Sequence, residues 1–328
     1  MANLLTPILL FGLLLTAWLS LGLGSVPVSV TAGLLDWLQG IPSREAMIVA
    51  EVRLPRTLLA LAVGASLGMS GAALQGLLRN PLADPSLVGA SQGAALGAAA
   101  VFYFGLFAAA GSLSVALAGL VGALLALLLM LGLAGRGSPS LMIMAGLAIA
   151  TVTSALLAVV LNFAPNPYAM QELVFWLLGS VAERGLDSLY ILLPSLLIGG
   201  SLVWHQRNLL AGLSLGDKVA QSMGLNVIAG SRLTVLGAAI MVGAAVSVAG
   251  NIGFVGLLIP HLIRPLVSHR PDRLLVPSAL AGGMLVCIAD MLVRLLPPGQ
   301  ELKLGVLTSL LGAPLFVWLV FKERSKWL

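Results

Sequence analysis

The sequence predicts an all-α, polytopic membrane protein with about ten transmembrane helices in one bundle. Three observations support this fold class. Hydrophobic residues make up 59% of the 328 positions and charged residues only 9%, the mean hydropathy is +1.07, and the apolar residues gather in long runs. Because a soluble globular domain has about 25% charged residues, the composition excludes that class.

The long apolar runs are the predicted membrane spans. About 20 apolar residues cross the hydrocarbon core as a helix, and a helix satisfies its own backbone polar groups in lipid. The first run is interpreted as a retained span rather than a signal peptide, because no Lys or Arg precedes it. Without an internal repeat or a linker, residues 1–328 are predicted to form one domain. The predicted spans are 4–23, 55–78, 87–110, 113–134, 141–163, 188–204, 233–250, 252–268, 274–295 and 304–321.

The distribution of charge predicts the orientation of the chain. If the N-terminus is cytoplasmic, the inner segments hold most of the 17 Lys and Arg residues, and the outer segments hold most of the 12 Asp and Glu residues. The positive-inside rule therefore favours both termini in the cytoplasm. The single cysteine, Cys287, lies in an apolar run, so an intrachain disulfide is excluded.

Two short turns precede the third span. Asn80-Pro81 and Asp84-Pro85 predict a stiff connection, because each proline restricts the residue before it. Gly89, Gly93 and Gly97 then recur every four residues, which predicts a close-packing face on a helix.

Two apolar regions do not have the pattern of a simple span. Residues 173–181 (LVFWLLGSV) are too few to cross and too apolar for open solvent, so a short helix at the outer mouth of the bundle is predicted. The run 246–266 is interrupted by three glycines and Pro260. Such breaks are tolerated at membrane depth where they are buried in protein or line a cavity.

Segment 213–227 (LSLGDKVAQSMGLNV) lies in the longest polar interruption of the second half, residues 205–232. Its pattern is that of a short helix, with Gly216 and Asp217 at the start, Val219, Ala220 and Met223 on an apolar face, and Gly224 at the end. Such an amphipathic element suits a groove on another protein. A solvated loop between two spans is the alternative, and the helical pattern alone leaves both open.

Residues for catalysis or cofactor binding are scarce. The sequence has no His-Glu-x-x-His and no P-loop, and its three histidines are far apart. We therefore predict no catalytic residue, no bound metal or cofactor and no nucleic-acid partner for this chain. If ATP drives its activity, ATP and Mg²⁺ must bind to a separate subunit.

Arginines predicted at the outer ends of spans run against the positive-inside bias. Arg53 and Arg56 precede the second span, and Arg294 ends the ninth. A basic cluster there suits an external acidic partner; local neutralisation by Glu51 and Asp290 is the alternative. Asp290 itself either pairs with Arg294 one turn later or belongs to a proton or ion relay, and the pairing is the simpler interpretation.

Five stretches cover most of the chain: RLPRTLLALAVGASLGMSGAALQGLLRNPLADPSLVGASQGAALG (53–97), LSLGDKVAQSMGLNV (213–227), GFVGLLIPHLIRPLV (253–267), LLVPSALAGGMLVCIADMLVR (274–294) and LGVLTSLLGAPLFVWL (304–319). In these stretches and in their order the sequence resembles the permease subunits of the iron-siderophore, haem and vitamin B12 class of ABC importers.

The resemblance implies a ten-span permease in the cytoplasmic membrane that pairs with a second permease chain. It also implies two cytoplasmic ATPase subunits and a periplasmic or lipid-anchored substrate-binding protein as partners. The residues that match functional positions of the family are Arg53, Arg56 and Arg294 for docking of the binding protein, Leu215, Gly216, Asp217, Ala220 and Gly224 for coupling to the ATPase, and Ser138, Pro139 and Ser140 for the cytoplasmic gate.

On this basis we expect a non-catalytic importer subunit whose cargo is an iron-siderophore complex, with haem and cobalamin as alternative cargoes. The resemblance further implies that the fifth, eighth and tenth spans line the pathway. A gradient-driven secondary transporter is the competing hypothesis. It requires polar or ionisable groups meeting near the midplane, and Asp290 is the main candidate.

Overall fold

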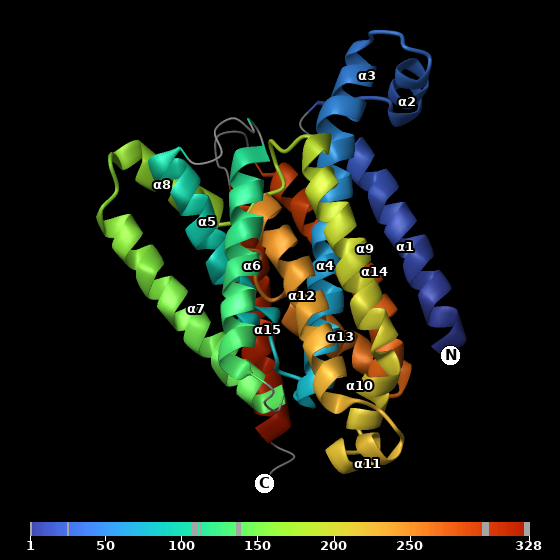
Figure 1. The fold of residues 1–328 in the computed structure, drawn as a ribbon. Coiled ribbons are helices and arrows are strands. Elements are labelled where there is room, and N and C mark those ends of the chain that lie inside the picture. The colour runs from blue at the N-terminus through green and yellow to red at the C-terminus, as the bar shows by residue number, and fades with distance from the viewer. Residues whose placement is uncertain are drawn as a thin grey trace.

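The computed structural model describes residues 2–24, 26–105, 111, 113–135, 139–296 and 302–324. Every regular element within these ranges is helical, and the helices stand side by side in one bundle (Figure 1). The all-α fold class is therefore confirmed.

Within the described ranges, seven helices are long and apolar enough to cross a membrane. Three further helices have apolar stretches of only 10–17 residues. Each predicted span overlaps one of them. The seven are α1 (Ala2–Gly22), α4 (Leu54–Leu78), α6 (Ser114–Ala134), α7 (Pro139–Asn162), α9 (Leu189–His205), α12 (Val227–Ala249) and α14 (Pro271–Arg294), and the three are α5 (Ala90–Phe104), α13 (Val255–Ile263) and α15 (Leu304–Arg324).

Short helices lie at the two ends of the bundle. One end carries α2 (Val30–Leu38), α3 (Arg44–Met47) and α8 (Pro167–Leu177), and we call it the α8 end. The opposite end carries α10 (Arg207–Leu213) and α11 (Asp217–Ser222), and we call it the α11 end. Helix α1 begins and α15 ends on the side of the α11 end (Figure 1).

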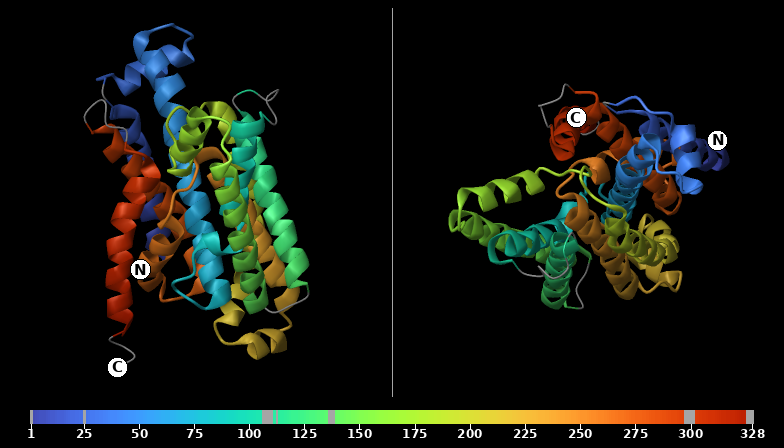
Figure 2. Two further views of the ribbon diagram at one scale, coloured as in Figure 1. Left: turned by 90° about the vertical axis from the view of Figure 1, so that its left-hand side faces the viewer. Right: turned by 90° about the horizontal axis from the view of Figure 1, so that it is seen from above.

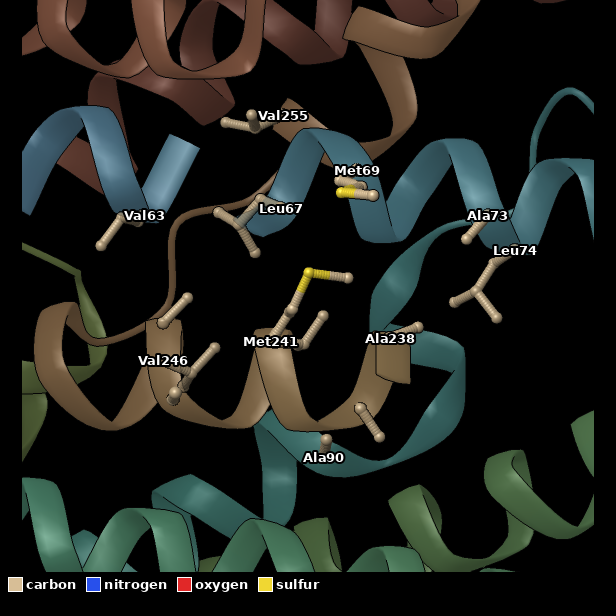
Figure 3. Close-up of a cluster of buried hydrophobic side chains, with 14 of the residues drawn as sticks. Val63, Leu67, Met69, Ala73, Leu74, Ala90, Ala238, Met241, Val246 and Val255 are labelled. Carbon is tan, nitrogen blue, oxygen red and sulfur yellow. The ribbon is translucent and has the colours of Figure 1, made fainter. Parts of the chain in front are cut away.

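Helices α4 and α12 form the centre of the bundle. Their apolar windows are 83% and 78% buried, against 17% for α1 and 22% for α7. Met69 of α4 and Met241 of α12 face one another between the two helices (Figure 3). Seen from above, α1 and α7 lie on opposite sides of the molecule (Figure 2), as expected for helices that leave most of their surface to lipid or a partner.

Glycines allow the central helices to approach closely. A Cβ added to Gly71 of α4 would overlap the carbonyl oxygen of Gly256 in α13. The predicted glycine face at 89–97 is confirmed for Gly93 and Gly97, which lie directly on α6. Gly89 instead precedes α5 with a φ of 78° and lies against α7. Small residues at such crossings are the usual means of packing helices in lipid.

Replacing Gly71 with alanine is expected to lower stability by about 1–3 kcal/mol or more, since the added methyl group has no room. Thermal unfolding of the purified protein in detergent measures the change. The matched control is Gly132→Ala on α6, where an added Cβ meets nothing within 4 Å. A Gly71→Ala protein as stable as the control would contradict the close contact between α4 and α13.

Three predicted spans have different bounds in the structure. The span 252–268 is wrong as a continuous membrane helix, because α13 has only 9 residues and continues as a single turn, η5 (Arg264–Val267). Residues 250–253 are not helical, and Gly250 and Phe254 have positive φ values of 71° and 66°. Helix α5 begins at Ala90, after the short η2 turn (Pro85–Val88), rather than at residue 87.

Helix α12 begins six positions before the predicted residue 233, at Val227. The side chain of Asn226 caps it by accepting a hydrogen bond from the backbone N–H of Ala229 at 3.0 Å. This extension shortens the polar interruption and places segment 213–227 directly against the start of a long helix.

The α8 end contains one expected and one unexpected feature. The predicted short apolar helix is present as α8, although it spans Pro167–Leu177 and ends before residue 181. The pair α2 and α3 was not predicted; each is capped by a serine side chain, Ser29 and Ser43, that accepts a backbone hydrogen bond. Helix α3 then continues through the π-helical stretch η1 (Ile48–Arg53) into α4.

Candidate functional site

A buried charged cluster lies near the α8 end, where α4 and α14 meet. The carboxylate of Asp290, only 1% exposed, accepts from the Nε of Arg56 at 2.9 and 3.0 Å and lies 2.8 Å from its Nη2. On its other side it accepts from the Nε of Arg294 at 2.8 Å. The predicted pairing of Asp290 with Arg294 is therefore confirmed, and Arg56 joins it from 234 positions away.

Arg294 also attaches α1 to the bundle. Arg294 donates from Nη1 to the carbonyl oxygen of Ser20 at 2.9 Å and from Nη2 to its hydroxyl at 3.2 Å. Two basic groups share one carboxylate here, so the cluster carries an excess positive charge. The side chain of Arg56 is 21% exposed and that of Arg294 is 6% exposed, so Arg56 presents most of this charge to the surface.

Arg53 occupies a different position from the other two arginines. It is 5% exposed, and its guanidinium donates to the carbonyl oxygens of Leu21 and Gly22, both at 2.8 Å, and of Val26. These bonds satisfy the carbonyls that the end of α1 leaves without helical partners. Arg53 thus fastens α1 to α4, and its predicted role in docking stays a prediction.

Segment 213–227 forms the tip of the α11 end. Helix α11 begins at Asp217, directly after Gly216 with φ +111°, and Gly224 follows it with φ +78°. The predicted short helix between two glycines is confirmed. Asp217 also lies 3.1 Å from Arg79 at the end of α4, which ties the segment to the central helix.

The apolar side chains of segment 213–227 divide into two sets. Ala220 is fully buried against Gly212 of α10, so this member of the predicted face points into the protein. Leu215, Val219 and Met223 are 66%, 41% and 58% exposed. A tip of exposed apolar side chains on a well-anchored turn has the character of a docking element.

The three predicted gate residues are only partly covered by the structure. Helix α7 begins at Pro139, and Ser140 is exposed in its first turn. Ser138 lies outside the described residues.

A cavity of about 350 Å³ lies beside the non-helical stretch at 250–253. Its lining comes from α4, η2, α5, α12 and α13 and includes Asp84, Ser91, Gln92, Asn251 and Phe254. The interrupted run 246–266 therefore lines a cavity, which is one of the two settings in which such breaks are tolerated. Sequence analysis did not identify these polar lining residues, because the elements that bring them together are far apart in the chain.

The sequence and the fold both match known transport proteins. Residues 12–322 match the model of the FecCD transport family. The hemin transport system permease protein HmuU of Yersinia pestis is 37% identical over 330 residues, covering 98% of this chain and 97% of the relative. The vitamin B12 import system permease protein BtuC of a Salmonella arizonae strain is 39% identical over 292 residues, covering 88% and 86%.

A solved structure of a metal-chelate type ABC transporter in an inward-facing conformation superposes with a TM-score of 0.81. It is 31% identical in sequence and covers 98% of this chain and 100% of its own. The family match, the two relatives and this structure agree over nearly the whole length. The chain therefore belongs to the FecCD transport family, the permeases of metal-chelate type ABC importers.

Proposed function

We propose that this chain is the membrane-spanning subunit of a binding-protein-dependent ABC importer that carries an iron-siderophore complex across the cytoplasmic membrane. The observation that carries the proposal is the tip of the α11 end, where Leu215 and Met223 expose apolar side chains on a turn anchored to α4 and α12. Family membership supports an ATPase as the partner that covers this tip.

The proposed assembly contains two copies of the permease, two ATPase subunits at the α11 end and one substrate-binding protein at the α8 end. In this arrangement the α11 end faces the cytoplasm, and so do both termini. ATP and Mg²⁺ are bound by the ATPase subunits. Helices α7 and α15 expose many apolar side chains, which supports contact with a second permease chain or with lipid.

The proposed mechanism couples the α11 tip to the centre of the bundle. Closure of the ATPases around ATP moves segment 213–227, and α12, which begins directly after it, transmits the movement. The cavity beside residues 250–253 borders α12 and α13, so a tilt of α12 changes its shape. Alternating opening toward either side follows from such rocking.

Cargo identity is tested by uptake into proteoliposomes that contain the permease, its ATPase and its binding protein. The metal-chelate type relative and the hemin permease support an iron chelate, and the B12 permease makes cobalamin an alternative. ATP-dependent uptake of a ferric siderophore, with neither haem nor cobalamin accumulated, is the expected result. Uptake of haem or cobalamin alone would reassign the cargo and keep the transport mechanism.

Docking of the binding protein is expected to depend on Arg56, the most exposed member of the charged cluster. Arg56→Gln should weaken docking several-fold at low ionic strength and less at high ionic strength, because the lost attraction is electrostatic. The control is Arg44→Gln on α3, an exposed arginine at the same end. Equal docking of both variants in a binding titration would place the interface elsewhere.

A further inference from the structure

A second cavity, of about 400 Å³, lies at the α11 end on the side where α1, α9 and α14 come together. Its lining combines polar and apolar groups from five parts of the chain: Thr6, Trp204, Arg207, Val267, Asp272, Arg273, Val276 and Pro277. All of them lie within the first two turns or the last turn of their helices. The cavity therefore sits at the level where the hydrocarbon core meets the headgroup region.

The charged groups of this cavity leave a positive surplus. Asp272, the only acidic lining residue, pairs with Arg270, whose Nη2 lies 2.7 Å from the carboxylate. The hydrogen bond from Arg270 to Asp272 raises the pKa of Arg270 above its ordinary value. Arg207 and Arg273 are thus left as two cationic groups whose charge Asp272 does not neutralise.

One of these arginines is held in place by an aromatic ring. The guanidinium of Arg207 lies 4.7 Å from the centre of the Trp204 ring, and its Nη1 donates to the Trp204 carbonyl oxygen at 3.4 Å. This contact orients the planar guanidinium group of Arg207. Its remaining N–H groups are suited to donate hydrogen bonds to phosphate oxygens. Tryptophan at this depth is also typical of membrane interfaces.

The surface leading away from the cavity is apolar. On α1, Leu10 and Leu14, which follow Thr6 at intervals of four residues, are 47% and 61% exposed, and on α9 Leu197, seven positions before Trp204, is 68% exposed. Residues at these spacings share a helix face, so the apolar surface extends along both helices from the residues that line the cavity. An amphiphile with an anionic head in the cavity could lay its acyl chains on them.

We propose that this cavity binds the phosphate headgroup of an anionic phospholipid from the inner leaflet, with Arg207 and Arg273 as the phosphate ligands. Basic pockets between membrane helices on the cytoplasmic side are suited to such headgroups. The cavity volume falls within the range of about 300–1,000 Å³ that is usual for small-molecule sites. The assignment to the inner leaflet rests on the proposed function, in which the α11 end faces the cytoplasm.

Native mass spectrometry of the full-length protein, titrated with phosphatidylglycerol or phosphatidylcholine, tests the proposal. Each arginine near the surface contributes about 1 kcal/mol, so Arg207→Gln/Arg273→Gln should weaken phosphatidylglycerol binding about thirtyfold and leave phosphatidylcholine unchanged. Arg273→Gln alone, which keeps the Trp204 stacking, should weaken it about fivefold. Arg232→Gln, a basic residue of α12 outside the cavity, should have no effect.

Three results would overturn the assignment. They are unchanged phosphatidylglycerol affinity in the double variant, an equal loss for both lipids, or an equal loss in the Arg232→Gln control. Inorganic phosphate in large excess separates the two phosphate sources. Competition that removes the lipid completely would assign the cavity to free phosphate, whereas retained lipid supports the headgroup together with its acyl chains.

Discussion

Leu215→Glu/Met223→Glu is expected to weaken association of the ATPase with the permease by about thirtyfold or more. The two side chains are 66% and 58% exposed at the tip of the α11 end. In a docked complex both would be removed from water, and apolar contacts of this kind contribute about 1 kcal/mol each, or about 2 kcal/mol together. Two buried carboxylates without partners add a desolvation cost. Co-purification and stimulated ATP hydrolysis measure the loss.

The control for this change is Leu38→Glu on α2, which is 74% exposed at the opposite end. It should leave ATPase association unchanged. Bulky substitutions at Gly216 and Ala220 are less selective tests, because Ala220 is fully buried and Gly216 has a φ of +111° that strains any side chain. Normal ATPase stimulation in the Leu215→Glu/Met223→Glu protein would show that segment 213–227 is not the coupling element.

Asp290→Asn is expected to lower the free energy of unfolding by about 3–5 kcal/mol, since it leaves Arg294 and the partly exposed Arg56 without a counter-charge. Arg56→Gln in the same protein removes one of the two cations and should restore a large part of the stability. Unfolding in mixed detergent micelles measures both variants. The control is Asp36→Asn on α2, outside the cluster, which should change stability by less than about 0.5 kcal/mol.

The same variant separates the importer from a gradient-driven transporter. Asp290 is held between two arginines at 2.8–3.0 Å, an arrangement that suits a structural ion pair joining α4 and α14. Uptake by the Asp290→Asn protein, normalised to the folded and assembled fraction, should persist. Abolished uptake in a folded and assembled protein would favour a relay through Asp290.

Local patterns predicted local features well. The glycines that flank α11, the pairing of Asp290 with Arg294 one turn later and the glycine contacts of α5 with α6 all depend on neighbours within a few residues or on one helix face. The serines that cap α2 and α3 were equally local signals. The helices that they cap have only 9 and 4 residues, which is too short for a helical pattern to stand out beside the long apolar runs.

Contacts between distant parts of the chain could not be predicted in the same way. Arg53 reaches backbone carbonyls 27–32 positions away. Because every residue has a backbone carbonyl, no sequence pattern marks the acceptors. Arg56 meets Asp290 across 234 positions. Phe254 adopts a left-handed φ of 66° that bulky residues seldom take, so the short length of α13 was not evident from its composition.

The most direct test of the proposed function is purification of the tagged chain from its native membrane in a gentle detergent, followed by mass spectrometry of the proteins that accompany it. We expect an ATPase with Walker motifs in a one-to-one ratio with the permease, together with a second permease copy. Reproducible recovery of the chain without an ATPase, under conditions that preserve other ABC importers, would contradict the proposal.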